Sequence, residues 1–408
     1  MASQNLRIAI VGGGIGGLTL ALALRQRGMK ADVFEQAAQL VEIGAAVALS
    51  ANSTRELQRL GLLDGIAAAS SEPTELIYRN WQNGRRIAAH PVRTGDQYRR
   101  RFGAPYLGIH RASLQRVLSD ALGGEGLHLG HRLVNLIERA GSIDLEFANG
   151  HVTQADLVIG ADGVRSAVRS WVADGTGTLY SGTSAFRGIV PADRLPSLPD
   201  PEAIQFWMGP DAHLLHYAIG AAGEDINYFA VVEGPTAWPE AGRSTMEIEP
   251  GEALAAFKGW HPAVTEMIGA TPHALRWGLL VARPLRRWHR GRAILMGDAA
   301  HAMLPHHGQG ANTTIEDAIT MAELLRCATT TGLSAMMHRF EELRRQRTRI
   351  IQRSSWATNR KLHLPDGPDL AQRDATLRHF PERFGWIHAF DAMQAVSQVD
   401  GVVPVAEQ

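Results

Sequence analysis

The stretch LRIAIVGGGIGGLTLALALRQRGMKADVFE, residues 6–35, decides the fold of this chain of 408 residues. Residues 6–11 form a short, apolar and β-branched run, which is typical of a strand buried inside a parallel sheet. Residues 12–17 form a glycine-rich turn, residues 18–27 follow a helical pattern, and residues 31–34 are typical of a second strand. The sequence therefore predicts a β-α-β unit at the start of the chain.

The glycine turn has the spacing G-x-G-x-x-G at Gly12, Gly14 and Gly17. These glycines allow a tight turn and let the backbone approach a pyrophosphate, toward which the helix N-terminus presents free N–H groups. Glu35 follows at about the 20-residue distance at which a carboxylate accepts hydrogen bonds from ribose hydroxyls. An acid at this position disfavours a 2′-phosphate, so the site suits FAD or NAD better than NADP.

Short apolar strands return at residues 156–159 and 293–296, after the first unit has been interrupted. Between them, apolar segments separated by proline-rich loops indicate an antiparallel sheet. The predicted fold class is α/β, or α+β overall, with a discontinuous Rossmann-like dinucleotide-binding domain, an inserted antiparallel-sheet domain and C-terminal helices. The expected boundaries are 1–75, 105–180 and 276–360 for the first domain, 76–104 and 181–275 for the second, and 361–408 for the C-terminal helical segment.

Other segments have simpler patterns. They are expected to form helices at 52–63, 112–122, 314–326 and about 334–361, a hairpin at 77–87 and a basic polar loop at 93–104.

Composition excludes several classes of protein. Lys plus Arg and Asp plus Glu both count 41, and this zero net charge is unlike a nucleic-acid or polybasic membrane-binding protein. Cys327 is the single cysteine, so we expect no disulfide within the chain and no metal site. The start of the chain is short and polar, and no apolar run reaches about 18 residues. We therefore expect no signal peptide, no membrane span and a cytoplasmic location.

Two further motifs follow buried strands. Counting the glycine turn as the first motif, the second is GADGVRSAVR, residues 160–169, and the third is GDAAHAMLPHHGQGAN, residues 297–312. Asp298 is a candidate ligand for sugar-like hydroxyls, and the glycines near the end of the third motif lead into a helix whose N–H groups can face an electron-rich group.

The order of these three motifs resembles the class A flavoprotein monooxygenases, the FAD-dependent aromatic hydroxylases, over about residues 6–350. Residues 297–312 are especially similar to salicylate hydroxylases, and the layout also resembles 3-hydroxybenzoate 6-hydroxylase and 6-hydroxynicotinate 3-monooxygenase. The resemblance implies that the discontinuous domain binds FAD and that the inserted sheet forms a substrate domain. It implies hydroxylation of a small phenol or hydroxylated N-heteroaromatic compound with NAD(P)H and O₂, through a flavin C4a-hydroperoxide.

The resemblance also assigns residues to the cofactor. The pyrophosphate, ribose, ribityl and flavin contacts fall on Gly12, Gly14, Gly17, Glu35, Arg111, Asp162, Asp298, Gly310, Ala311 and Asn312. Arg165 is matched along with Asp162 to a motif that contacts FAD and NAD(P)H, whereas Arg169 is expected to form an ion pair within the protein. The absence of a second G-x-G-x-x-G favours a transient visit by NADH or NADPH, without deciding between the two.

The candidate catalytic residues are His213, Tyr217 and His306. A general base that removes a phenolic proton makes the ring electron-rich, and histidine has its ordinary pKa close to working pH, so the rate should rise with pH near neutrality. His213 and Tyr217 alternate along one predicted strand and so share a face. His306 matches a salicylate-hydroxylase histidine near the ring, although the adjacent His307 could take its place, and His301 is expected to be structural.

Several alternatives stay open at this point. The same scaffold could perform epoxidation or oxidise a purine-like heterocycle, or the chain could be a non-catalytic flavin- or NAD-sensing protein. The arginine-rich tracts at 283–290 and 99–101 are either solvated connections or docking patches for NAD(P)H phosphates. The sequence does not decide the aromatic substrate, the ring position, an accompanying decarboxylation, or a monomer against a homodimer.

Overall fold

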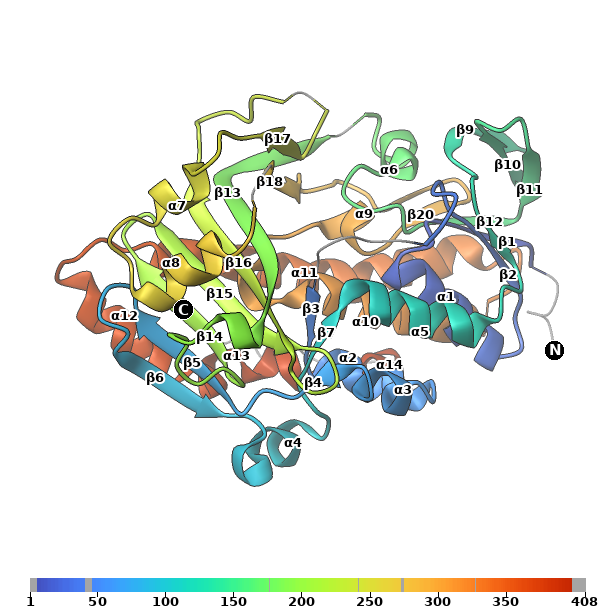
Figure 1. The fold of residues 1–408 in the computed structure, drawn as a ribbon. Helices are drawn as coiled ribbons and strands as arrows, with labels where there is room; N and C mark the ends of the chain where they lie inside the picture. The colour runs from blue at the N-terminus through green and yellow to red at the C-terminus, as the bar shows by residue number, and fades with distance from the viewer. Residues whose placement is uncertain are drawn as a thin grey trace.

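The computed structural model describes residues 6–40, 46–175, 177–240, 242–272, 275–326 and 328–397. A six-stranded sheet in the order β19-β20-β12-β1-β2-β8 contains the predicted β-α-β unit (Figure 1). All its neighbours pair in parallel except β19 with β20. Its strands are β1 (Ile8–Val11), β2 (Ala31–Phe34), β8 (Leu127–His128), β12 (Leu157–Gly160), β19 (His289–Arg290) and β20 (Ala293–Leu295).

The second large sheet has eight strands in the order β17-β18-β13-β16-β15-β14-β5-β6. Its pairs are antiparallel except β14 with β5, which are parallel and bring Ile204 opposite Leu76. Its strands are β5 (Glu75–Asn80), β6 (Arg86–Pro91), β13 (Thr178–Pro191), β14 (Ile204–Gly209), β15 (Ala212–Ile219), β16 (Asp225–Glu233), β17 (Thr245–Glu247) and β18 (Leu275–Ala282). β18 begins at Leu275 and ends at Ala282, so it belongs to this sheet although most of it lies beyond residue 275, where the sequence places the end of the inserted domain. The domain boundaries stay a prediction.

Two three-stranded sheets complete the β-structure. One is the meander β11-β10-β9, and the other, β3-β7-β4, lies at the start of helix α2. Their strands are β3 (Ala46–Leu49), β4 (Ser70–Ser71), β7 (Leu107–His110), β9 (Leu133–Arg139), β10 (Ser142–Phe147) and β11 (Val152–Ala155).

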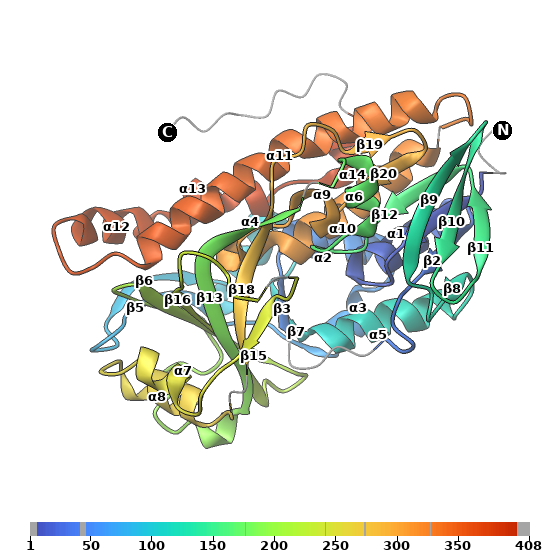
Figure 2. The same cartoon turned by 90° about the horizontal axis from the view of Figure 1, so that it is seen from above.

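Helices cover both large sheets and join them. The long α11 runs from beside β19 and β20 to the region of α12 and α13, and α7 and α8 lie on the far side of the eight-stranded sheet (Figure 2). The helices are α1 (Ile15–Gln26), α2 (Ala51–Arg59), α3 (Leu63–Ala67), α4 (Gln97–Phe102), α5 (Arg111–Leu122), α6 (Ala167–Val172), α7 (Glu252–Ala256), α8 (Pro262–Gly269), α9 (Asp298–His301), α10 (Gln309–Arg326), α11 (Leu333–Leu362), α12 (Asp369–Arg378), α13 (Phe380–His388) and α14 (Ala392–Ser397), with 3₁₀ turns η1 (Thr94–Asp96), η2 (Ala192–Arg194) and η3 (Pro305–His307).

The structure corrects the prediction in two segments. The predicted loop at 93–104 contains the helix α4, because Tyr98 and Phe102, four residues apart, are both buried on one helical face. The helix predicted from residue 314 begins at Gln309, inside the third motif. Cys327 lies outside the described residues, and none of the described helices is long and apolar enough to cross a membrane.

Candidate active site

The glycine turn between β1 and α1 has the shape that a pyrophosphate requires. A Cβ on Gly17 would collide with the carbonyl oxygen of Gly12, so the turn closes only with glycine there. A Cβ on Gly14, by contrast, would meet no heavy atom within 4 Å, although Gly14 caps the N-terminus of α1. The turn thus leaves open space in front of free helical N–H groups, which fits a bound pyrophosphate.

Glu35 lies beside this turn at the end of β2. Its Oε2 accepts a hydrogen bond of 2.7 Å from the N–H of Gly13, and its Oε1 accepts one of 2.9 Å from Ala37. The carboxylate is therefore held at the edge of the turn, where the predicted ribose would lie.

The carboxylate of the second motif, residues 160–169, forms hydrogen bonds within its own loop. The carboxylate of Asp162 accepts hydrogen bonds from the hydroxyl of Ser166 and from the N–H of Val168, at 3.1 Å for the latter. Burial raises the pKa of Asp162, although these hydrogen bonds oppose the effect. Arg169 donates to the carbonyl of Ala299 at 3.2 Å, which connects the second motif to the third. The expected roles of Asp162 and Arg165 toward cofactor stay predictions.

The third motif forms the central wall of the site. Asp298 begins α9 directly after β20, and a Cβ added to Gly310 would meet only the carboxylate of Asp298, at 4.0 Å. Gly310 and Ala311 belong to the first turn of α10, so that free N–H groups of this helix point toward the same space as Asp298.

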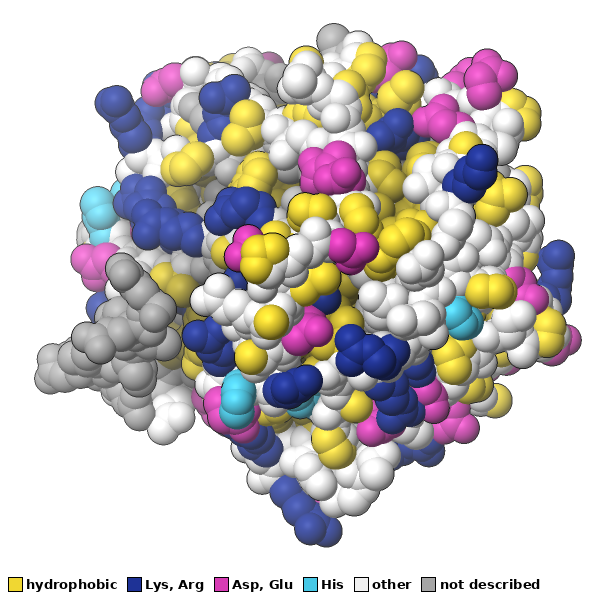
Figure 3. Space-filling model, turned by 90° about the vertical axis from the view of Figure 1, so that its left-hand side faces the viewer, with side chains coloured by type: hydrophobic (Ala, Val, Ile, Leu, Met, Phe, Trp, Pro, Cys, Tyr) yellow, Lys and Arg dark blue, Asp and Glu magenta, His cyan; other side chains and the backbone are white. Residues whose placement is uncertain are grey.

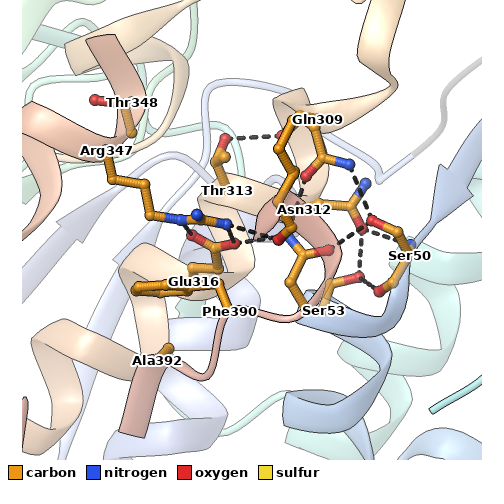
Figure 4. A network of polar contacts seen from close by, with 12 residues as sticks. Ser50, Ser53, Gln309, Asn312, Thr313, Glu316, Arg347, Thr348, Phe390 and Ala392 are labelled. Atoms are coloured by element: carbon orange, nitrogen blue, oxygen red, sulfur yellow. Dashed lines mark hydrogen bonds and ion pairs between the residues drawn. The ribbon is translucent and has the colours of Figure 1, made fainter. Parts of the chain in front are cut away.

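The side chain of Asn312 is engaged within the protein. It donates to the carbonyls of Ala48 and Gly308, at 2.8 and 2.6 Å, and it accepts from the N–H of Ser50 and the hydroxyl of Ser53 (Figure 4). Its side chain therefore fastens the start of α10 to the start of α2. Gly310 and Ala311 line the cavity but Asn312 does not, so the flavin contact that the resemblance implies for Asn312 stays a prediction.

A cavity of about 260 Å³ opens between this wall and the eight-stranded sheet. Residues predicted to contact FAD, such as Asp298 and Gly310, border this cavity on one side and residues of the eight-stranded sheet border it on the other, so it would hold both the flavin ring and the substrate. Its lining includes Ala48, Tyr78, Tyr106, Arg111, Arg187, Phe206, Leu215, Tyr217, Asn227, Phe229, Asp298, Met303, His306, His307, Gly310, Ala311 and His388. Aromatic rings and aliphatic groups with few polar side chains suit a flat, hydrophobic ligand with specific polar substituents.

The structure brings together the three predicted catalytic residues. Tyr217 and His306 line the cavity, and His213 lies behind His306 with ring centroids 5.0 Å apart. His213 and Tyr217 share a face of β15 as predicted, whereas His216 points to the other face and lies near Trp207. His213 itself is almost completely buried and is absent from the cavity lining.

Burial sets the charge of these histidines. It lowers the pKa values of His213 and His306 well below the ordinary value, and the neighbouring histidines lower them further. Both are therefore neutral near pH 7. Neither ring nitrogen of His306 has a hydrogen-bond partner among the described residues, so the ring is free to serve either as acceptor or as donor toward a ligand.

Two other histidines of the third motif are held by neighbouring side chains. Nε2 of His307 lies 2.8 Å from the hydroxyl of Ser354 on α11, although its ring also lines the cavity. Nε2 of His301 lies 2.6 Å from the buried carboxylate of Asp317. The contact of His301 lies inside the protein, and His306 is the histidine of this motif that lines the cavity with neither ring nitrogen bonded among the described residues.

Sequence reasoning missed Arg187, which lies in β13 and lines the cavity. Its guanidinium stacks on the ring of Trp277, 3.4 Å from the centroid. An arginine inside the otherwise apolar run SAFRGIV was the available signal, because a charged side chain rarely lies in such a strand without a partner or ligand. A guanidinium at a ligand cavity suits a carboxylate.

The basic tracts are partly neutralised by local acids. Arg287 and Arg290 pair with the two carboxylate oxygens of Asp174, at 2.7 and 3.0 Å, and Arg99 pairs with Glu72 at 2.7 Å. On the face drawn in Figure 3, Lys and Arg side chains lie among Asp and Glu side chains. Among the described residues no group of three or more His, Cys, Asp and Glu is placed to hold a metal ion.

Comparison with known proteins identifies the class. Residues 5–355 match the family described as FAD binding domain. The 3-amino-4-hydroxybenzoate 2-monooxygenase of Streptomyces cremeus is 38% identical over 391 residues, covering 95% of this chain and 96% of that protein. The 6-hydroxynicotinate 3-monooxygenase of Bordetella bronchiseptica is 35% identical, covering 89% and 94%. A solved salicylate hydroxylase substrate complex has a TM-score of 0.83 at 28% identity, covering 97% of this chain and 98% of that chain.

The chain therefore belongs to the FAD-binding domain family. The predicted resemblance to FAD-dependent aromatic hydroxylases, the mixed fold with a Rossmann-like sheet, the FAD cofactor and the monooxygenase class are confirmed. The roles given to individual residues stay predictions, and the geometry above is what supports them.

Proposed function

We propose that this enzyme hydroxylates a small phenolic carboxylate of the hydroxybenzoate type, with 3-amino-4-hydroxybenzoate as the first candidate. The observation that carries the proposal is the cavity, where His306 and the guanidinium of Arg187 lie in one aromatic-lined space next to Asp298. His306 is neutral and has no hydrogen-bond partner among the described residues. One group can accept a phenolic proton and the other can pair with a carboxylate. The name of the Streptomyces cremeus relative supports the candidate substrate.

The residues of this chain would act in three ways. The glycine turn, Glu35 and Asp298 hold the dinucleotide, and the first turn of α10 directs its N–H groups at the flavin ring. When bound, FAD accepts a hydride from NADH or NADPH and activates O₂ for transfer of one oxygen atom to the ring. Tyr217 and the walls of the cavity orient the substrate and exclude water, and His306 takes the phenolic proton so that the ring becomes electron-rich.

The test is a substrate panel with purified holoenzyme. NADH and NADPH oxidation, O₂ uptake and product mass are measured with 3-amino-4-hydroxybenzoate, 4-hydroxybenzoate, salicylate, 6-hydroxynicotinate and uric acid. We expect hydroxylated product from a hydroxybenzoate, formed at a ratio near one to the reduced nucleotide consumed. Turnover of uric acid alone would replace the proposal by heterocycle oxidation, and flavin binding without turnover of any member would favour a sensing protein.

The proposal includes a cytoplasmic location and a monomer or homodimer, with NAD(P)H, O₂ and the aromatic compound as its partners. Cytoplasmic NAD(P)H supply supports the location. Cell fractionation and sedimentation velocity test these two points separately from the activity.

A further inference from the structure

A chain of polar side chains connects the buried histidine pair to the protein surface. Nδ1 of His213 lies 2.7 Å from Nε2 of His363, and Nδ1 of His363 lies 2.6 Å from Oε1 of Glu233. The side chain of His363 is only 4% exposed, whereas that of Glu233 is 49% exposed. His306 lies on the cavity side, where its ring contacts that of His213 with centroids 5.0 Å apart and without a hydrogen bond between them, so the four side chains lie in a row from the cavity to solvent.

Four separate elements contribute to this series. His306 lies in η3, His213 in β15, Glu233 at the last position of β16, and His363 directly after α11. The N–H of Asp211, in the turn before β15, donates to the carbonyl of His363 at 3.2 Å and fixes its position. A contact between residues so far apart in sequence is held by the packing of the whole molecule.

We propose that His306, His213, His363 and Glu233 form a proton relay that carries the phenolic proton of the substrate from the closed cavity to solvent. The inference rests on the function proposed above and assigns His363 and Glu233, which do not line the cavity, as positioning residues for proton exit.

The hydrogen bonds determine which nitrogen holds each proton. The carboxylate of Glu233 is an acceptor, so Nδ1 of His363 carries a hydrogen and its Nε2 holds a lone pair. Nδ1 of His213 must then donate to that lone pair, which leaves Nε2 of His213 as an acceptor. Glu233 thereby fixes the tautomer of a buried histidine through an intervening ring, as a carboxylate orients the histidine of a catalytic triad.

Proton transfer along this series is balanced. The substrate hydroxyl gives its proton to one nitrogen of His306, whose other nitrogen passes a proton to Nε2 of His213 through one bridging water, because no hydrogen bond joins the two rings among the described residues. The Nδ1 proton of His213 then moves to Nε2 of His363, and the Nδ1 proton of His363 moves to Glu233, which releases it to water. One proton enters and one leaves, and the reverse transfer returns a proton to the product oxygen and restores every tautomer.

The surrounding charges are consistent with this role. Besides burial, the neighbouring His363 and His306 lower the pKa of His213. Besides burial, His363 and His307 lower the pKa of His306. Burial lowers the pKa of His363, and the charges of Glu233 and Asp211 oppose this effect. No member is therefore locked in the cationic form near pH 7, which a relay requires.

The experiment measures proton release when 3-amino-4-hydroxybenzoate binds to the oxidised holoenzyme. Stopped-flow mixing in weak buffer with a pH-indicator dye gives the rate constant for release, and the ultraviolet spectrum of the ligand reports ionisation. We expect His363→Gln to slow release by about 100-fold, and Glu233→Gln by about 10-fold. Added imidazole should restore the rate of Glu233→Gln, because that side chain lies at the surface.

Asp211→Asn is the matched control. It removes an exposed charge that acts on His363 while leaving the hydrogen bonds of the relay intact, so release should stay within about twofold of wild type. Equal slowing in Asp211→Asn would replace the relay by a general electrostatic effect. A wild-type enzyme that hydroxylates normally while both relay variants release protons at the wild-type rate would overturn the relay alone.

Nitrogen-15 NMR of histidine-labelled holoenzyme without substrate gives a second readout that does not depend on the proposed substrate. Glu233→Gln should shift the tautomer signals of His363 and His213, and His363→Gln identifies which signals belong to His363. If wild-type enzyme neither binds nor hydroxylates any hydroxybenzoate, the proposed function fails. Unshifted tautomer signals in Glu233→Gln would then reject the relay as well.

Discussion

At the scale of single residues, the glycines of the first turn have different tasks. Gly17 is required by the fold, since a Cβ there would collide with the backbone of Gly12, whereas Gly14 borders open space and has φ −76° and ψ −174°, which any residue can adopt. The same motif therefore separates into a position that closes the turn and a position that faces the ligand.

The first prediction compares alanine at these two glycines. Gly14→Ala should fold with an unfolding free energy within about 0.5 kcal/mol of wild type but bind FAD at least about 10-fold more weakly, because its methyl group occupies the cofactor space. Gly17→Ala should lose several kcal/mol of stability and give little folded protein. Thermal melting of the apoprotein and flavin fluorescence titration measure the two quantities, and equal behaviour of the two variants would contradict the division.

His306 lines the cavity, and neither of its ring nitrogens is bonded among the described residues. His306→Gln should reduce hydroxylation by about 10² to 10⁴-fold and raise the share of O₂ released as hydrogen peroxide, with FAD content unchanged. His307→Gln is the matched control, and its effect should be smaller because His307 bonds to Ser354. Assays of product formed and hydrogen peroxide released per NAD(P)H, with and without catalase, measure the effect. A larger loss of hydroxylation in His307→Gln than in His306→Gln would assign the proton-accepting role to His307.

The pH dependence of hydroxylation belongs to the same scale. The sequence predicts that the hydroxylation rate rises with pH near neutrality, but burial lowers the pKa values of His213 and His306 well below 6.5. The active neutral form should therefore persist to lower pH, and kcat should rise with pH through an ionisation below 6.5. A rate profile from pH 4.5 to pH 8, with FAD content checked at each point, tests this. A limb at or above 6.5 would mean that substrate ionisation itself is observed.

At the scale of elements, α10 is the helix on which the site depends. Its buried carboxylate Glu316 accepts from Arg347 at 2.7 Å (Figure 4). It also accepts from Arg344 at 2.6 Å and from the amide of Asn52 at 2.6 Å. The adjacent Asp317 accepts from the N–H of Gly297 at 2.8 Å and thereby holds the turn that carries Asp298. The ion cluster thus positions both cofactor-facing ends of the third motif.

The next prediction concerns this cluster. Glu316→Gln leaves two buried guanidinium groups without their full counter-charge, so the unfolding free energy should fall by about 3–5 kcal/mol. FAD retention should fall with it. Glu342→Gln, on the exposed face of α11, removes a surface pair and should change stability by less than about 1 kcal/mol. Urea unfolding of the two variants compares these values, and similar midpoints would show that the cluster does not fasten α10.

At the scale of the molecule, the sequence predicted the parts of the fold that have strong local signals. The glycine turn, the second strand at 31–34 and the long helix from Leu333 all agree closely with the structure. Helix α4 was missed because three arginines between Tyr98 and Phe102 conceal its single buried face. The start of α10 was missed because glycines and histidines resemble a turn, although Asn312 is fixed there by contacts with α2.

The residues of the candidate site also fall into those with a local sequence signal and those that only the packing of the chain brings together. His213, Tyr217 and His306 could be selected because strand alternation and a motif identify them locally. Arg187, His363 and Glu233 could not be linked, since only the packing of β13, β16 and the end of α11 brings them near the cavity or the histidine pair.

The last prediction is for the stability of the whole molecule against acid. Burial lowers the pKa values of several described histidines, among them His213, His216, His306, His307 and His388, with His216 and His388 at about 3 and His307 at about 4. Below pH 6.5 these histidines bind protons in the unfolded chain but stay neutral in the folded chain, so the free energy of unfolding falls as pH falls. Each histidine contributes a slope of about 1.4 kcal/mol per pH unit.

Urea unfolding of holoenzyme and apoprotein between pH 7.5 and pH 5 measures this slope. His216→Leu is the control, because this ring lies on the far face of β15 with neither nitrogen bonded among the described residues. Its removal should make the slope shallower without touching the cavity. A midpoint that is constant from pH 7.5 to pH 5 would contradict the burial of neutral histidines.

The interleaved order of strands in the six-stranded sheet has a consequence for how the protein is made. β1 and β12 are neighbours in space, but β12 pairs next with β20, at Ala293–Leu295, and the wall of the site ends only with α10. A nascent chain emerges from the ribosome N-terminal end first, so the glycine turn appears long before its partners. About three-quarters of the chain must therefore be synthesised before the six-stranded sheet and the first turn of α10 can both form, and until then the edges of the first strands lack their partners.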